Sequence, residues 1–376
     1  MQVETRRVKM LDKGNMREAA ESAPTSENAQ SIYQADGFPQ NSFEHSKEQA
    51  ENLEKEFRKK MNSSESVKPR LVTLTHAELL KREIPPRKFV LSPWLPEAGI
   101  SMVFSPTGIG KTYLGLSMAR VIASGGKLFG WEASHPRKVL YVDAEMHESD
   151  LQQRIKKLGG GFEKEMPDES YLRYLNGTWL SNGQSIPDLS TKEGQLSIED
   201  SIGNTQVLFL DNLSTLCRSG KENEVGAWMQ MQSWLLSLRW RGITVVLIHH
   251  SGKAKDEGGN PIQRGSSARE IILESILVLK RPKDYSAEHG CVFEGHFLKS
   301  RGFQGVDAAP FEARLKEKKG VLFWEYRQLE ARNYDLIIDL FNDGITNPRE
   351  IGEEIGISRQ AVQKHINKAK QDGDIR

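Results

Sequence analysis

The chain has 376 residues, which is more than one compact domain usually needs, and its formal net charge is +1. A charge so close to zero excludes a global nucleic-acid or membrane-surface signature, so any DNA contact must come from local patches. The hydrophobic content of 37% is low for a fully globular chain and predicts that part of it is poorly ordered.

The two cysteines, Cys217 and Cys291, form neither a CxxC pair nor a regular ladder. This usage favours a reducing compartment and argues against a disulfide framework or a zinc site. The first residues lead into no apolar stretch, and no run approaches the roughly 18 apolar residues of a membrane span. We therefore expect a cytoplasmic protein with no membrane partner.

Residues 1–66 are polar, rich in Ser, Glu, Gln and Asn, and close to neutral. This composition predicts a disordered arm, with at most a solvated helix over residues 46–61. The arm is either a flexible linker or a segment that binds a partner, and its neutrality excludes a basic DNA-binding tail. We place the domain boundaries at 1–66, 67–330 and 331–376.

In residues 67–330, apolar strand-like runs alternate with helical stretches. Continuous Val, Ile and Leu runs separated by helices are typical of a mostly parallel sheet covered on both faces, which makes the fold class α/β. Closely spaced later strands predict antiparallel additions at one edge. The predicted strands are 100–104, 138–142, 206–210, 243–248, 276–279, 292–298 and 321–326, and the predicted helices include 111–124, 149–158, 193–202 and 224–239.

Residues 105–112 read Ser-Pro-Thr-Gly-Ile-Gly-Lys-Thr and lie between a predicted strand and a predicted helix. This is the context of a phosphate-binding P-loop, whose amides and helix N-terminus point at the phosphates. Lys111 would reach the β- and γ-phosphates and the Thr112 hydroxyl would ligate Mg²⁺, although Ser105 replaces the usual first glycine. The alternative is a Gly-rich turn before a helix. The predicted ATP-binding residues are Ser105, Pro106, Thr107, Gly108, Ile109, Gly110, Lys111 and Thr112.

Two further strands end in carboxylates. Asp211 follows the apolar run 207–210, and in a P-loop protein such an acid lies beside Mg²⁺ and helps to hold it. Asp143 and Glu145 follow the run 138–142, at the strand end where parallel sheets bind ligands. Glu145 is our candidate catalytic base and Asp143 a supporting acid. The alternatives are a buried strand with an acidic end and ordinary surface acids.

His249 and His250 end another predicted core strand. Two polar rings at such a strand tip are unusual for packing, so one could hydrogen-bond the γ-phosphate and report its loss to the following loop. We place His250 ahead of His249 in this role. The alternative is a satisfied core histidine, and zinc binding lacks partners at ligand spacing.

Basic, glycine-containing loops follow these strands, at residues 217–221 and 252–261. The second carries Lys253 and Lys255 and leads into Arg264. Flexible basic loops at one end of a sheet suit a DNA phosphate backbone, and solvated surface loops are the alternative.

Lys299 and Arg301 follow the last residues of another strand. Arginine suits bidentate contact with phosphate, so at a subunit boundary this pair could complete a neighbour's nucleotide site as an arginine finger in trans. An ordinary basic surface is the alternative.

After residue 331, three helices are predicted at 334–341, 348–355 and 358–371, with Ser358 as the N-cap of the third. The spacing indicates a helix-turn-helix, winged-helix-like unit. Positive charge is concentrated on the third helix, which fits a recognition helix for duplex DNA. A small helical packing or oligomerisation module is the alternative. The predicted DNA-binding residues on this helix are Arg359, Gln360, Gln363 and Lys364.

Several of these segments, in this order, resemble the RecA-fold P-loop ATPases of the RepA type, which are plasmid and phage replicative helicases that work as hexameric rings. They are residues 105–112, 143–145, 210–214, 248–253 and 264–268, and the resemblance covers about residues 68–330. It implies ATP and Mg²⁺ as cofactors. It further implies that Lys111 and Thr112 bind nucleotide and metal, with Glu145 as catalytic carboxylate, Asp211 as metal-side acid, His250 as sensor and Arg301 with Lys299 as trans finger.

These observations predict an ATP-hydrolysing motor that assembles as a ring, moves along single-stranded DNA through its core loops and binds duplex DNA through its C-terminal helices. One alternative is a DNA-binding regulator whose ATPase core is a slow switch. Another is a recombinase-like filament.

Overall fold

The computed structural model describes residues 73–159, 161–179, 186–218, 225–255, 261–263 and 270–375. The predictions for the arm at 1–66, for part of the loop 217–221 and for Arg264 lie outside these residues. The chain divides into two units, 1–84 and 85–376, and only residues 73–84 of the first are among those described. In the described part of the first unit, α3 (His76–Lys81) begins at a capping box in which Thr75 and Glu78 satisfy each other's backbone N–H groups.

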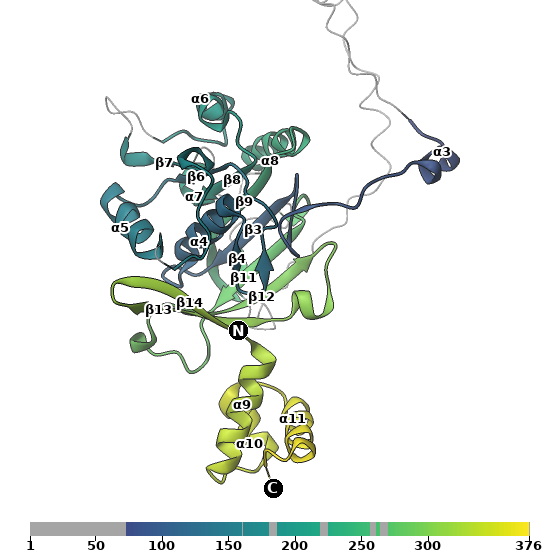
Figure 1. Cartoon of the computed structure of the whole chain (residues 1–376), viewed down its shortest axis with the longest axis vertical. Coiled ribbons are helices and arrows are strands. Elements are labelled where there is room, and N and C mark those ends of the chain that lie inside the picture. The colour runs from purple at the N-terminus through teal and green to yellow at the C-terminus, as the bar shows by residue number, and fades with distance from the viewer. Residues whose placement is uncertain are drawn as a thin grey trace, which may run out of the picture. The chain divides into compact units, whose positions relative to one another are not determined.

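In its described residues, the second unit is built on a ten-stranded sheet whose centre is parallel. Its order is shown in Figure 1 and runs β11 (Ser275–Lys280), β3 (Ile100–Ser105), β9 (Thr244–Lys255), β8 (Val207–Asp211), β6 (Val139–Asp143) and β7 (Leu172–Asn176). Antiparallel strands extend the β11 edge as β12 (Val292–Ser300), β13 (Phe311–Lys318) and β14 (Val321–Gln328). Both the α/β class and the antiparallel additions at one edge are confirmed.

Helices cover both faces of this sheet, because alternate strand residues point to opposite sides. Tyr141 and Phe209 belong to one buried cluster, whereas their neighbours Leu140 and Leu208 belong to the other. The first cluster is covered by α4 (Lys111–Ser124) and α5 (Glu148–Gly159), and α4 ends where Gly125 takes φ +70°. The second is covered by α6 (Lys192–Ile202), α7 (Leu213–Leu216) and α8 (Val225–Trp240).

Short elements complete the core. Two small antiparallel pairs form from β1 (Phe89–Leu91) with β2 (Leu95–Pro96) and from β4 (Lys127–Leu128) with β5 (Trp131–Glu132). They bring aromatic rings such as Trp94 and Trp131 together, with centroids 5.2 Å apart. Four 3₁₀ turns are described at Glu169–Tyr171, Gly177–Trp179, Ala287–His289 and Gly305–Ala308.

The structure corrects three strand predictions. Strands β7 and β13 were not predicted, because charged and polar residues interrupt their apolar pattern and both lie toward an edge. Strand β9 does not end at residue 248, where we predicted a tip followed by a loop. It continues to Lys255 and forms a hairpin with β10 (Pro261–Gln263), because the chain beyond His250 pairs with β10.

The C-terminal helices are α9 (Leu329–Asn342), α10 (Pro348–Ile355) and α11 (Arg359–Asp372). They bury a small core of their own, composed of Ile337, Ile351, Val362, Ile366, Ala369 and Ile375. The Ser358 hydroxyl caps α11 by accepting from the Ala361 amide at 3.2 Å. The described residues 329–375 contain no strand that would serve as a wing. Among the residues described across the chain, no helix is both long and apolar enough to cross a membrane.

Candidate functional site

The predicted site residues meet at the carboxyl edge of the parallel strands. The register places Ser105 of β3 beside His250 of β9, and Asp143 of β6 beside Asp211 of β8. A cavity of about 450 Å³ opens at this edge, within the usual size range of ligand pockets. Its lining includes Lys111, Thr112, Asp143, Glu145, Asp211 and His250.

The backbone conformation of the P-loop explains why its first residue can be serine instead of the usual glycine. Positive φ angles fall at Gly108 (+78°) and Gly110 (+122°), whereas Ser105 is the last residue of β3 and takes an ordinary extended conformation. Its carbonyl and its hydroxyl each accept a hydrogen bond from the Lys111 amine at 3.1 Å, and the Pro106 carbonyl accepts another at 2.8 Å. Ser105 thus supplies contacts to Lys111 in place of conformational freedom.

Gly110 is required by a close approach. A Cβ built on this glycine would lie 2.4 Å from Sγ of Cys291, which is closer than real Cβ atoms come. The Cys291 thiol donates to the Ile109 carbonyl at 3.5 Å, and burial raises the pKa of this thiol to about 11. The P-loop is therefore packed closely against the start of β12.

Lys111 is nine-tenths buried, and this burial lowers the pKa of its amine to about 8. The negative charges of Asp211 and Glu145 oppose the shift. A phosphate placed beside this amine would favour its protonated form in the same way.

Asp211 is buried, and its burial raises the pKa of the carboxyl to about 6. The Tyr141 hydroxyl donates to Oδ2 of Asp211 at 2.7 Å, and hydrogen bonds from Tyr141 and Thr112 together with the charge of Lys111 partly offset the shift. Thr112 and Asp211 thus lie within hydrogen-bonding reach of one another, as the prediction for a shared metal ion requires.

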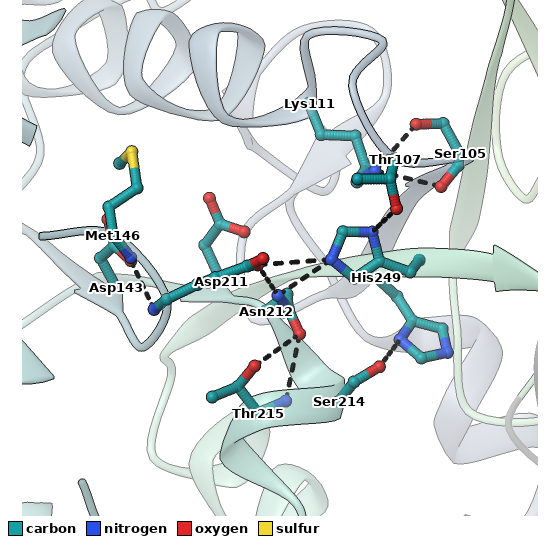
Figure 2. Close-up of polar contacts among 12 residues, drawn as sticks. Ser105, Thr107, Lys111, Asp143, Met146, Asp211, Asn212, Ser214, Thr215 and His249 are labelled. Atoms are coloured by element: carbon teal, nitrogen blue, oxygen red, sulfur yellow. Dashed lines mark hydrogen bonds and ion pairs between the residues drawn. The ribbon is translucent and has the colours of Figure 1, made fainter. Parts of the chain in front are cut away.

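Asp143 shapes the turn that presents Glu145. Its Oδ1 accepts from the amides of Glu145 at 2.9 Å and Met146 at 3.0 Å, as Figure 2 shows in part. Its Oδ2 is buried and has no hydrogen-bond partner among the described residues, and burial raises the pKa of the carboxyl. Asp143 therefore orients the turn, and Glu145 at its tip keeps 58% of its side chain exposed to the pocket.

Asn212 joins Glu145 to His250. Its Oδ1 accepts from the amide of Thr215 at 3.1 Å at the start of α7, which fixes the orientation of the side-chain amide (Figure 2). The Nδ2 group then donates to Glu145 Oε2 and lies 3.1 Å from His250 Nε2. The same His250 Nε2 lies 3.4 Å from Glu145 Oε2, and its Nδ1 lies 3.4 Å from the Thr107 hydroxyl. One chain of contacts thus links Glu145, Asn212, His250 and Thr107 of the P-loop.

The two histidines face opposite sides of the sheet, because they are adjacent in a strand. His250 lines the cavity with 21% of its side chain exposed, whereas His249 is fully buried and contacts the Ser214 hydroxyl at 3.3 Å. The structure thus places His250, and not His249, at the predicted site.

Sequence reasoning missed three residues at this site: Arg154 and Arg281, which line the cavity, and Asn212, which contacts Glu145 and His250. Asn212 follows Asp211 directly and could have been found from the polar pair at the strand end. Arg154 on α5 lies over the Tyr113 ring at 4.8 Å, and Arg281 lies over the Tyr285 ring at 3.9 Å. Arg154 and Arg281 belong to no motif, so no sequence signal marked them.

Other predicted residues lie elsewhere. Strand β12 is antiparallel to β11, so Lys299 and Arg301 lie at the end of the sheet opposite the P-loop, and Lys299 donates to the Glu270 carbonyl. Within one chain they do not reach the cavity. Lys253 and Lys255 lie on the continuation of β9 beyond His250.

The α11 residues predicted to read DNA share an exposed face. Arg359, Gln360, Gln363 and Lys364 are exposed, and Lys364 pairs with Glu330 at 3.4 Å. His365, on the same helix, is buried against the Tyr334 ring, with centroids 5.9 Å apart. This arrangement leaves a polar, basic surface over a small apolar core.

The residues present fit a magnesium nucleotide. Phosphate calls for backbone amides and an amine, which the P-loop and Lys111 supply. Mg²⁺ calls for hydroxyl and carboxylate oxygens, which Thr112 and Asp211 supply, and the orphaned Oδ2 of Asp143 is a buried oxygen at the same edge of the sheet.

A comparison with protein families agrees with this fit. A family model described as an AAA domain matches residues 65–256, and this match supports an ATPase. Similar solved structures include the RadB recombinase (15% identity, TM-score 0.40, 60% of this chain and 90% of that one). Others are the flagellar accessory protein FlaH from Methanocaldococcus jannaschii (11%, 0.41, 61% and 90%) and a KaiC-like protein from Pyrococcus horikoshii OT3 (13%, 0.42, 64% and 99%).

Proposed function

Because this chain belongs to the AAA domain family, we propose that it binds ATP at the carboxyl edge of its sheet and hydrolyses it to drive movement along DNA. The full proposal is a ring-forming, Mg²⁺-dependent replicative helicase of a plasmid, phage or other mobile element. Single-stranded DNA would contact the core, and duplex DNA would contact the C-terminal helices.

The P-loop would hold the phosphates through its amides and the Lys111 amine. When bound, Mg²⁺ would neutralise charge that develops on the phosphates, and Thr112 and Asp211 are the residues that would hold it. Asp143 would keep the turn after β6 in place through its bonds to two backbone amides.

Glu145 would orient and polarise the attacking water. Its carboxylate is exposed at the cavity and is fixed by Asn212, so it is both accessible and positioned. His250 contacts the same amide group and the P-loop Thr107, and β9 continues from it to Lys255. A change at the γ-phosphate would therefore act on the strand that carries Lys253 and Lys255.

The DNA part of the proposal is supported by charge and exposure. Arg359, Gln360, Gln363 and Lys364 form an exposed polar face on α11, which suits phosphate and base-edge contacts. Lys253, Lys255 and Arg264 would contact single-stranded DNA, as basic residues that follow the sensor in sequence.

The ring is proposed because Lys299 and Arg301 lie at the end of the sheet opposite their own cavity. They could complete a nucleotide site only on a neighbouring subunit. Arg301→Ala and Glu145→Gln subunits should each be inactive alone, whereas a mixture should recover part of the hydrolysis. Normal hydrolysis by assembled Arg301→Ala protein would contradict the finger role.

One observation carries the proposal. Lys111, Thr112, Glu145, Asp211 and His250 come from distant parts of the sequence and line one cavity. A purely structural protein gives no reason for buried charged groups to converge on a P-loop, because such burial opposes folding.

The test is steady-state ATP hydrolysis with and without single-stranded DNA. We expect hydrolysis that DNA stimulates and that Lys111→Ala abolishes. Lys127→Ala is the matched control, because Lys127 is an exposed lysine paired with Glu132 at 3.5 Å, away from the cavity. Wild-type protein that neither binds nor hydrolyses ATP would overturn the proposal.

A second candidate is a DNA-binding regulator with a slow ATPase switch, and the exposed face of α11 is the observation that favours it. Slow hydrolysis that is indifferent to single-stranded DNA, together with tight duplex binding, would select the regulator over the motor.

A further inference from the structure

A loop between β11 and β12 holds the backbone of the P-loop. Arg281, at its start, donates to the Gly108 carbonyl at 2.6 Å and also to the carbonyls of Gly290 (3.2 Å) and Val292 (3.0 Å). Its guanidinium lies 3.9 Å from the centre of the Tyr285 ring. One rigid fork thus joins both ends of the loop 281–290 to the tip of the P-loop.

This contact determines where P-loop amides point. The carbonyl and the N–H of one peptide unit point in opposite directions, because the unit is planar and trans. Holding the Gly108 carbonyl outward therefore turns the Ile109 N–H toward the inside of the loop. The Cys291 thiol holds the next carbonyl, that of Ile109, in the same way. Residues outside the P-loop thus fix the direction of two successive N–H groups, those of Ile109 and Gly110.

The same loop is fixed from its other side by the C-terminal helices. Arg332 of α9 is buried, and its Nη2 lies 2.7 Å from Oδ1 of Asp284, the fourth residue of the loop. The same guanidinium contacts Glu312 of β13 at 2.7 Å, which anchors it to the sheet. Asp284 is 59% exposed, so the loop is bound to α9 by a charge pair at its surface.

A second contact joins the loop to the turn between α10 and α11. A Cβ built on Gly356 would lie 2.4 Å from Cε of Lys283, so the lysine stem passes over this glycine, which has φ +83°. A cavity of about 680 Å³ lies between Thr107 and Ile109 of the P-loop on one side and Arg332 and Gly356 on the other. The loop thus contacts both the P-loop and the helices that share this cavity.

We propose that Arg281 is a positioning residue for the P-loop and that the Asp284–Arg332 pair makes its loop a mechanical link between α9 and the nucleotide site. This inference rests on the proposed nucleotide site. Arg281 acts on the backbone amides rather than on phosphate, so its loss should weaken nucleotide binding before any chemistry occurs.

The first test measures the Kd of a fluorescent ADP analogue on the full chain. Arg281→Ala should weaken binding about tenfold, which is the size of effect expected for loss of a hydrogen bond from a charged donor. The matched control is Arg173→Ala, because Arg173 also donates to a backbone carbonyl, that of Ile202 at 3.3 Å, but at the far edge of the sheet. Unchanged ADP affinity in Arg281→Ala would overturn the positioning role.

The second test addresses the link to α9. Asp284→Asn should weaken ADP binding about threefold, as expected for a partly exposed charge pair. Asp335→Asn is the control, because Asp335 is similarly exposed and pairs with Arg327 at 3.7 Å without contacting the loop. Equal affinities for the two variants would overturn the link.

Amide hydrogen exchange over residues 105–112, measured without nucleotide, separates this inference from the proposed function. Arg281→Ala should speed exchange there, whereas Arg173→Ala should not. If wild-type protein bound no ADP, the proposed function would fail, and the exchange result alone would decide this inference. Unchanged exchange would then overturn it.

Discussion

Polar residues are buried at the carboxyl edge of the sheet, whereas they are exposed on the face of α11. Lys111, Asp143 and Asp211 are at least nine-tenths buried, whereas Arg359 and Gln363 are exposed. Burial shifts the pKa of Lys111 down to about 8 and that of Asp211 up to about 6. Buried groups with fixed positions and shifted pKa values suit catalysis, whereas exposed groups on a helix suit reversible contact with a partner.

The largest effect should come from Glu145, the proposed base at the sheet edge. Glu145→Gln is expected to lower the rate of ATP hydrolysis about 100-fold or more while ADP affinity stays within about twofold, because the loss of a positioned base slows the chemistry and leaves the P-loop intact. Single-turnover hydrolysis and ADP binding measure the two effects. Glu148→Gln is the control, since Glu148 accepts from the Trp179 indole on the surface nearby. A normal hydrolysis rate in Glu145→Gln would remove this residue from the chemistry.

A smaller effect is expected at His250, the proposed sensor. His250→Gln should lower kcat about tenfold, because Asn212 and Thr107 lose the ring that joins them, with the size typical of one side chain that assists a positioned base. His147→Gln tests specificity, since His147 is exposed and contacts Ser149 at 2.8 Å. Equal kcat values for the two variants would show that His250 only packs.

At the α11 face the effects should be modest and confined to DNA. Arg359→Ala is expected to weaken duplex binding a few-fold and to reduce the slope of log affinity against log salt by about one, as loss of one phosphate contact does. ATP hydrolysis without DNA should not change. Fluorescence anisotropy at several salt concentrations measures the first two quantities. A lower rate of ATP hydrolysis without DNA would contradict the expectation that α11 acts on DNA alone and the sheet edge on ATP.

The smallest effect concerns the stability of the C-terminal helices against pH. Burial lowers the pKa of His365 below its usual 6.5, so the folded helices favour the neutral ring. The unfolded state therefore binds the proton more readily, and stability should be lost as pH falls from 6.5 through the lowered value. Glu330 opposes this shift, whereas Lys364 and Lys368 add to it.

Hydrogen exchange over residues 329–375 at pH 5.5 and 7.5, corrected for intrinsic rates, measures this dependence. His365→Gln has no titrating ring at this position and should show less of it. The same pH dependence in both proteins would assign it to another group.

Much of the fold was predictable because its signals are local. Apolar runs, the glycine stop of α4 and the Ser358 cap act within a few residues, and the structure places the corresponding elements within one or two residues of the prediction. The α9 helix begins earlier than predicted, at Leu329. Strands β7 and β13 escaped prediction because their patterns are mixed, and pairing with neighbours rather than composition makes them strands.

The candidate site was predictable only where a motif carried it. Lys111, Thr112 and Asp211 belong to short patterns with a physical reason, whereas Arg281 and Arg154 are single arginines in segments without a pattern. The predicted loop after His250 proved to be a strand up to Lys255, because β10 supplies the partner that extends β9. The pairing of β9 with β10 leaves no short-range signal in the sequence from which it could be predicted.

The sequence by itself determined most of the strands and helices, the Ser358 cap and the presence of a P-loop, because periodicity and turn chemistry are short-range properties of the chain. Only the tertiary structure decided which histidine faces the cavity, which groups are buried enough to shift their pKa, and which arginine holds the Gly108 carbonyl. Those features depend on strand register and on contacts between residues as far apart as Gly108 and Arg281. Such contacts exist only once the sheet has formed.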